Sequence, residues 1–380
     1  MISDLYRSVD RQKLRCQKAF QQTAQQGKGM NILNQEQGEN WTLAHGDCIE
    51  VLNAMPDESV HLSIFSPPYA SLYTYSNSDR DLGNSASDEQ FYEHFRYVVS
   101  GLLRVTKPGR IVCVDVMNIP AMKERDGYIG LKDFRGDVIR AFQGTEASEM
   151  YRTILNLRRR ALVARCAGDY DRNKRLASAA DEIEHEMLNA QSASGFIFHS
   201  EHCAWKDPLT EATRTKALGL MHKQLCKDST RSRAGIPQYL LAFRKDGENA
   251  EPVAHIDGMT EFAGENPPIH GNLSHERWRR YASPVWMDIN FSNTLNAAAA
   301  RDNEDERHVC PMALDLIERA MYLWSNPGDV VFDPFSGVGS TGYQAIKMGR
   351  KFIGAESKES YFRQAVKNIA AARSNQGGLF

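Results

Sequence analysis

The stretch that decides the fold is residues 330–342, VVFDPFSGVGSTG, near the carboxyl end of the chain. The apolar run 330–333 predicts a buried strand, and the glycines that follow it predict a tight turn. Apolar positions then recur at helical spacing until a second apolar run, 351–356, which ends on Glu356. This order of strand, turn, helix and strand predicts a βαβ unit of a parallel sheet.

The turn in this unit has the features of a nucleotide-binding site. Gly337 and Gly339 let a ligand approach the backbone closely, and the free N–H groups at the helix start favour an anionic group. Glu356 lies about twenty residues past Gly337, where such units place the acid that binds ribose hydroxyls. A structural turn followed by a surface carboxylate is the competing interpretation. A phosphate-loop hydrolase is disfavoured because the loop lacks the Gly-Lys-Ser/Thr core.

A second motif, SPPY at Ser66–Tyr69, follows the apolar run 60–65. That run predicts a short buried strand, and two prolines cannot continue it because they supply no N–H. The chain must therefore leave the sheet while presenting a hydroxyl, a carbonyl and an aromatic ring. These groups suit the binding of an exocyclic amino group and the stacking of a flat base. An ordinary strand exit with a buried tyrosine is the alternative.

Taken together, the two motifs resemble the amino-methylating DNA methyltransferases that use S-adenosylmethionine. The resemblance is to the permuted class, in which the catalytic tetrapeptide precedes the cofactor motif. Three further segments agree: 41–47 (WTLAHGD), 107–114 (KPGRIVCV) and 308–319 (HVCPMALDLIER). Two departures are Cys310, where the family usually has threonine, and Ser340, where threonine is commoner. The resemblance covers 40–118 and 305–372 well and 196–245 loosely.

The resemblance implies a three-layer, Rossmann-like α/β sandwich with a mostly parallel sheet and an antiparallel strand pair at one edge. Its two motifs would meet at the carboxyl ends of adjacent strands. The implied catalytic residues are Ser66, Pro67, Pro68 and Tyr69. The implied cofactor-binding residues are Asp47, Phe65, Asp333, Pro334, Phe335, Gly337, Gly339, Ser340, Thr341 and Glu356.

The expected chemistry is methyl transfer to the exocyclic amine of a flipped base. Ser66 Oγ and the Pro67 carbonyl would accept the two amine hydrogens and free the nitrogen lone pair for attack. Tyr69 would stack on the base, which must leave the duplex to be reached. Serine at position 66 resembles the cytosine-N4 members, so cytosine N4 is favoured and adenine N6 is the alternative. A catalytically silent DNA-binding relative is disfavoured by the intact motifs.

Composition fits a globular intracellular enzyme. Of the 380 residues, 42% are hydrophobic and 25% are charged, which is ordinary for a folded chain. The seven cysteines contain no CxxC pair, which argues against a disulfide scaffold or a zinc ribbon, and we expect no metal. We see no signal peptide and no membrane-spanning run. We expect a cytoplasmic protein of bacterial or phage origin, a monomer or homodimer, acting on double-stranded DNA. A companion restriction endonuclease and a solitary enzyme are both open alternatives.

The net charge is −2, yet basic residues cluster in 131–175 and 206–245. Phosphate contacts need a local cluster rather than a basic whole, so Arg158, Arg159, Arg231 and Arg233 are candidate DNA-binding residues. The competing interpretation of Arg158–Arg160 is a solvated helix face.

Several other groups with chemical potential are better explained as structural. His61 and His308 are candidate proton acceptors, but each fits a structural role more readily. The set His199, His202 and Cys203 lies along one strand end without a second ligand pair, which disfavours zinc. Cys310-Pro311 is the reverse of the Pro-Cys order typical of cytosine-carbon methylation.

The chain is expected to divide into six segments. They are an amino-terminal arm (1–40), the catalytic half of the methyltransferase domain (41–118), a helical insertion (119–195), closing strands with a basic loop (196–245), an irregular target-recognition segment (246–300) and the cofactor-binding half (301–380). The insertion is predicted to hold helices over about 147–190, interrupted at Gly168-Asp169.

Overall fold

The computed structural model describes residues 32–69, 88–121, 123–128, 130–144, 149–215, 220, 234–253, 278–296, 300 and 311–374. Within these ranges the strands of the main sheet run in the order β1-β2-β11-β10-β3-β4-β8-β7-β9. The five central strands are parallel to one another: β2 (Trp41–His45), β11 (Lys351–Glu356), β10 (Val330–Asp333), β3 (Val60–Phe65) and β4 (Thr106–Met117). The predicted mostly parallel sheet is therefore confirmed.

Both edges of the sheet turn antiparallel. The predicted closing strands, β8 (Gln238–Arg244) and β7 (Ile197–Ala204), pair antiparallel next to β4. A two-residue strand, β9 (Val285–Trp286), pairs with β7, and β1 (Asn34–Gln37) pairs antiparallel with β2 at the other edge. Strand β4 begins at Thr106, four residues before the expected 110. Thr106 pairs with Val60 of β3, and the register then shifts so that Leu62 pairs with Ile111.

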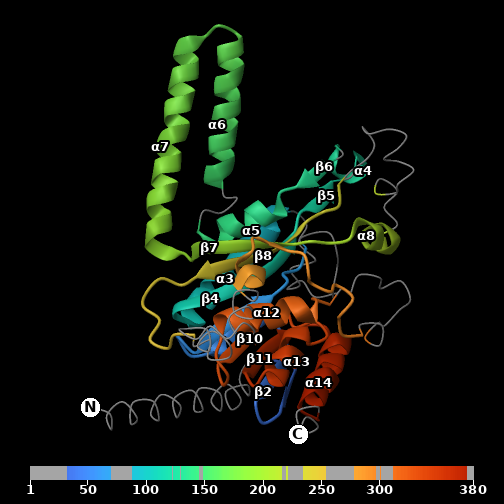
Figure 1. Cartoon of the computed structure of the whole chain (residues 1–380). Helices are drawn as coiled ribbons and strands as arrows, with labels where there is room; N and C mark the ends of the chain where they lie inside the picture. Colours follow the sequence, from blue (N-terminus) through green and yellow to red (C-terminus); the bar gives the residue numbers. More distant parts are fainter. Residues whose placement is uncertain are drawn as a thin grey trace, which may run out of the picture.

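Helices cover both faces of the sheet and give the predicted three layers (Figure 1). One core lies under α2 (Cys48–Ala54), α3 (Asp88–Val105) and α5 (Phe134–Phe142). The other lies under α12 (Leu314–Trp324), α13 (Ser340–Lys347) and α14 (Glu359–Ser374). The spacing of apolar residues explains this placement.

Helix α3 illustrates how the sequence selects its buried face. Its residues Phe91, Phe95, Val98 and Leu102 recur three or four positions apart and are fully buried. Burial of each such side chain contributes about 1.5–3 kcal/mol. The helix predicted over 88–105 is confirmed.

Outside the sandwich, a helical hairpin and a small ribbon extend from the sheet. The hairpin comprises α6 (Glu149–Cys166) and α7 (Tyr170–Ser194), which project away from the body (Figure 1, green). The predicted interruption is confirmed, since Gly168 has φ +77° and the Asp169 side chain accepts a hydrogen bond from the Arg172 N–H at 3.0 Å.

The ribbon pairs β5 (Ile119–Ala121) with β6 (Gly130–Lys132), joined through α4 (Lys123–Asp126). A further short helix, α8 (Pro208–Thr215), follows β7. None of the helices in the described ranges combines the length and apolar character that a bilayer span requires.

Candidate active site

The register of the sheet brings the two sequence motifs together at the carboxyl ends of two neighbouring strands, β3 and β10. Strand β10 lies parallel to β3 with Phe332 opposite Ser63, so the SPPY tetrapeptide and the glycine turn leave the sheet side by side. The Thr341 hydroxyl donates to the Ile64 carbonyl at 3.2 Å. The rings of Phe65 and Phe335 lie 5.6 Å apart between centroids. The predicted adjacency of motifs far apart in sequence is therefore present in the structure.

The Ser66 hydroxyl donates its proton to a backbone carbonyl. Its Oγ lies 3.0 Å from the backbone carbonyl of Asp115, on the neighbouring strand β4. A carbonyl can only accept, so the serine hydroxyl must donate its single proton there. The lone pairs of Ser66 Oγ thereby remain available to accept hydrogen bonds from another group.

Tyr69 is held by an aromatic neighbour. Its ring centroid lies 5.4 Å from that of Phe134, the first residue of α5, and both Ser66 and Tyr69 are half-buried. The two rings are tilted by 39° to each other, and aromatic contacts of this kind restrict the orientation of a ring.

The carboxylate of Glu356 organises the glycine turn. Its Oε2 accepts the Gly337 N–H at 2.7 Å, and its Oε1 accepts the Lys358 N–H at 2.8 Å. On the next strand, Asp47 caps α2 by accepting the Ile49 N–H at 2.9 Å. A carboxylate has about four lone-pair directions, so each of these acids can accept several hydrogen bonds at once.

The two glycines of the turn have different roles. Both have positive φ, +52° at Gly337 and +85° at Gly339. A Cβ built at Gly337 meets no atom within 4 Å, whereas one built at Gly339 would lie 3.0 Å from Ala365 Cβ on α14. Gly337 therefore borders open space, while Gly339 permits helix packing, a distinction that sequence could not make.

The remaining predicted cofactor residues are half-buried or buried. Phe335 is half-buried, whereas Phe65 and Pro334 are buried beneath the surface of the site. The buried Ser340 hydroxyl has no hydrogen-bond partner among the described residues. Ser340 is itself buried at the start of α13, and the open space lies three residues earlier, at Gly337.

Two buried acids lie at this edge with raised pKa values. Burial raises the pKa of Asp333 to about 7, opposed by the hydrogen bond from the Phe335 N–H. Burial likewise raises the pKa of Asp115 to about 6, opposed by the side-chain amide of Gln238. Gln238 Nε2 lies 2.6 Å from both carboxylate oxygens of Asp115. Sequence reasoning missed this pair, although an acid within the apolar run VCVDVM was a signal.

We expect Asp115→Asn to change how stability depends on pH. The folded-state pKa of Asp115, about 6, lies above its ordinary value of 3.8, so the wild type loses stability as pH rises between these values. The asparagine variant lacks this loss. Its free energy of unfolding relative to wild type should therefore rise by on the order of 2 kcal/mol between about pH 4 and 6.5.

Denaturant unfolding of both proteins across that pH range measures the difference between their free energies of unfolding. Taking this difference removes the pH dependence that the two proteins share. A difference that stays constant with pH would contradict the assignment of a raised pKa to Asp115.

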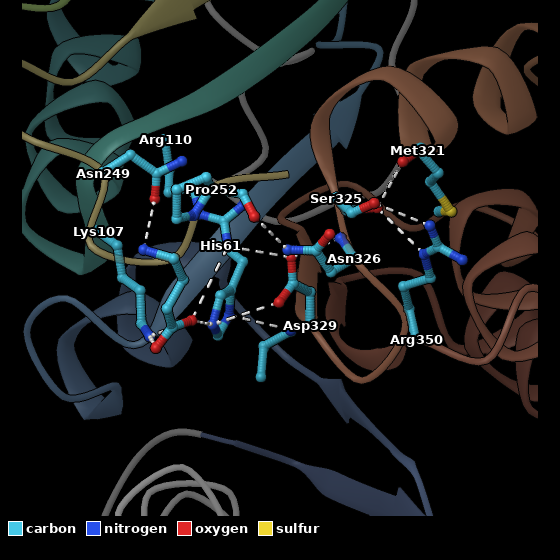
Figure 2. A network of polar contacts seen from close by, with 12 residues as sticks. His61, Lys107, Arg110, Asn249, Pro252, Met321, Ser325, Asn326, Asp329 and Arg350 are labelled. Atoms are coloured by element: carbon cyan, nitrogen blue, oxygen red, sulfur yellow. Dashed lines mark hydrogen bonds and ion pairs between the residues drawn. The ribbon is translucent and has the colours of Figure 1, made fainter. Parts of the chain in front are cut away.

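A structural polar network lies at the amino ends of the central strands, away from the two motifs (Figure 2). His61 Nδ1 accepts the Val330 N–H at 3.1 Å, and its Nε2 lies 3.0 Å from Glu251 Oε2. His61, Glu251 and Asp329 have the donor types of a metal site. However, Lys107 pairs with Glu251 at 3.1 Å and Arg110 pairs with Asp329 at 3.2 Å, which balances the carboxylate charges.

This network also decides the role of His61. The residue lies at the amino end of β3, roughly 17 Å of strand from Ser66 at about 3.3 Å per residue. His61 therefore cannot take a proton from the target amine. His202 is also structural, because its Nδ1–H donates to the Ser283 carbonyl at 3.0 Å and its ring stacks on Trp286.

The predicted DNA-binding arginines are only partly placed. Arg158 forms ion pairs with Glu184 and, at 3.5 Å, with Asp181 across the α6–α7 hairpin. Arg159 is exposed. Arg231 and Arg233, like His308 and Cys310, lie outside the described residues.

Comparison with known proteins shows the family of the chain. The model of the N6/N4 family, described as DNA methylase, matches residues 60–367, and the chain belongs to this family. The chain is 23% identical over 346 residues to the Type II methyltransferase M.BglI of Bacillus subtilis, covering 85% of this chain and 84% of that protein. It is 40% identical over 70 residues to the DNA adenine methyltransferase YhdJ of Escherichia coli, covering 18% of this chain and 24% of that one.

Among solved structures, a putative DNA modification methylase from Thermus thermophilus, complexed with S-adenosyl-L-methionine, matches with a TM-score of 0.50. The match covers 86% of this chain and 92% of that chain at 20% identity. This similarity confirms the Rossmann-like fold. Family membership makes the chain an S-adenosylmethionine-dependent DNA amino-methyltransferase. The carboxylates of Asp47 and Glu356 and the open space at Gly337 have the chemistry and the room that such a cofactor needs.

Proposed function

We propose that this enzyme methylates the N4 amine of cytosine in duplex DNA. In this proposal, Ser66 Oγ and the Pro67 carbonyl accept hydrogen bonds from that amine. The observation that supports this role is the hydrogen bond from Ser66 Oγ to the Asp115 carbonyl, which leaves the serine lone pairs free. Serine at position 66 resembles the cytosine-N4 members of the family. The alternative is adenine N6, favoured by the local identity to YhdJ.

The proposed mechanism is chiefly one of positioning. S-adenosylmethionine supplies a methyl group that is already electrophilic. Ser66 and Pro67 accept the two amine hydrogens, which weakens conjugation of the nitrogen lone pair with the ring and directs it toward that methyl group. Tyr69, supported by Phe134, stacks on the flipped base and holds it in line. No covalent enzyme intermediate is required: the bond between the methyl carbon and the cofactor sulfur would break as the bond to nitrogen forms, and the methylated nitrogen would then lose one proton.

In the same proposal, cofactor binding belongs to the carboxyl ends of β2, β11 and β10. Asp47 and Glu356 are the acceptors for hydroxyl or amino groups of the cofactor, and Gly337 and Ser340 line the turn. Thr341, hydrogen-bonded to the Ile64 carbonyl, fixes this turn against the catalytic strand. Asp333, Pro334 and Phe335 shape the turn itself.

The proposal extends to partners and to the segment that selects DNA sequence. The similarity to a Type II methyltransferase supports a companion restriction endonuclease as a partner. We assign target recognition to the predicted segment 246–300. Its described parts are 246–253, 278–296 and 300, and they include the edge strand β9.

The experiment is methyl transfer from labelled S-adenosylmethionine to unmethylated duplex DNA, with mass spectrometry of the product nucleosides. N4-methylcytosine is the expected product. N6-methyladenine would overturn the base assignment while leaving the acceptor roles of Ser66 and Pro67 in place. Cofactor binding without transfer to any of several genomic DNAs would favour a catalytically silent relative.

A further inference from the structure

The α6–α7 hairpin is closed at its base. The chain leaves the body after α5 and returns at β7, where the Phe196 N–H donates to the Phe142 carbonyl at 3.0 Å. The rings of these two phenylalanines lie 5.4 Å apart. The hairpin therefore enters and leaves the domain at one point, as a module inserted between α5 and β7 (Figure 1).

The two helices of the hairpin pack on each other rather than on the body. Ile154, Ala161 and Ala164 of α6 and Ala180 of α7 are buried. The α6 positions follow heptad spacing, seven residues from 154 to 161 and three to 164, which is typical of an antiparallel coiled coil with small residues at the seam. These four side chains thus pack within the hairpin and add little to the core of the domain, whereas Leu162, Val163 and Tyr170 near its tip are exposed.

The outer half of the hairpin is strongly basic. Between positions 159 and 175 the exposed cationic side chains are Arg159, Arg160, Arg165, Arg172, Lys174 and Arg175, while the acids in that stretch are Asp169 and Asp171. Asp169 is engaged as the cap of α7. None of the six cations forms an ion pair with another residue of the described ranges, in contrast to Arg158 with Glu184. Like charges held together on a rigid rod raise the local positive potential.

We propose that this hairpin is an arm that binds the phosphate backbone of DNA outside the target site. At 1.5 Å per residue, the 18 residues of α6 extend about 27 Å from the body, which equals roughly 8 base pairs of duplex. The arm therefore lengthens the footprint of the enzyme on flanking duplex and contributes affinity without reading sequence. The inference rests on the proposed function only in taking duplex DNA as the substrate.

The test compares two arm variants with wild type. One joins Gly144 to Gly195 through two glycines, which the hydrogen bond between Phe142 and Phe196 permits. The other carries Arg159→Glu, Arg160→Glu and Arg165→Glu and keeps the hairpin intact, so the test survives if the excision variant fails to fold. A matched control carries Lys347→Glu, Arg363→Glu and Lys367→Glu, exposed cations on α13 and α14.

Equilibrium binding to a duplex of about 40 base pairs and to one of about 12 is measured over a range of salt concentrations. Both arm variants should bind the long duplex at least about tenfold more weakly, with a salt slope smaller by roughly two to three, and the short duplex almost as wild type does. The control triple should match wild type on both.

Unchanged affinity and salt slope in the arm variants would overturn the proposal. A change from dimer to monomer on excision, with DNA binding unchanged, would also overturn it and identify a second copy of the chain as the partner. Product nucleosides from the same proteins keep the tests separate, because the base methylated bears on the proposed function and not on the arm.

Discussion

Ser66→Ala should lower the rate constant of methyl transfer by roughly 10²- to 10³-fold, the typical cost of removing one hydrogen-bonding group at a reacting centre. The expectation follows from the hydrogen bond of Ser66 Oγ, whose proton is donated to the Asp115 carbonyl so that its lone pairs can accept. Cofactor affinity should change little, because Glu356, Gly337 and Ser340 are untouched. Single-turnover transfer and cofactor titration measure the two quantities separately.

The matched control is Ser63→Ala. Ser63 lies three residues earlier on β3, and its buried hydroxyl lacks a hydrogen-bond partner in the described part of the structure. This change should leave the transfer rate near that of wild type. A Ser66→Ala enzyme that transfers methyl groups as fast as the Ser63→Ala enzyme would remove Ser66 from the mechanism.

Gly337→Ala should weaken cofactor binding by at least about tenfold, which corresponds to about 1.4 kcal/mol. The added methyl group would occupy the open space beside the turn, where a Cβ meets no protein atom within 4 Å. The positive φ of +52° adds backbone strain of roughly 1 kcal/mol for a non-glycine residue. Calorimetric titration with S-adenosylmethionine and thermal unfolding measure the two effects.

Gly328→Ala separates strain from occlusion. Gly328 also has a positive φ, +83°, and open space around its Cβ position. However, it precedes the amino end of β10, whereas Gly337 follows the carboxyl end of that strand. Both variants should lose similar stability, and only Gly337→Ala should lose cofactor affinity. Equal loss of affinity in the two variants would mean that the turn does not contact the cofactor.

Sequence predicted those parts of the fold that local pattern determines. The central strands β2, β3, β10 and β11, the helix α3 and the two-helix insertion all follow from periodicity and glycine placement, and the structure confirms them. The adjacency of the two motifs required one further rule, that parallel strands present their carboxyl ends at one edge.

Other features depend on contacts that no local pattern encodes. The pairing of Asp115 with Gln238 and that of His61 with Glu251 join residues 123 and 190 positions apart. They arise only once strand order and register are set. Strand β9 is two residues long and forms because β7 offers an edge, so its sequence has no strand signal of its own.

The hydrogen bond from Thr341 to Ile64 spans 277 residues, which has a consequence for the enzyme during its synthesis. At roughly 5–20 residues per second, a ribosome needs on the order of 15–55 s to make the chain between the two residues. The tetrapeptide that we propose to hold the target base leaves the ribosome long before the turn that we propose to hold the methyl donor. A nascent or prematurely terminated chain therefore has a base-binding strand with no β10 beside it and cannot modify DNA. Methylation begins only when the last strand and helices have been made.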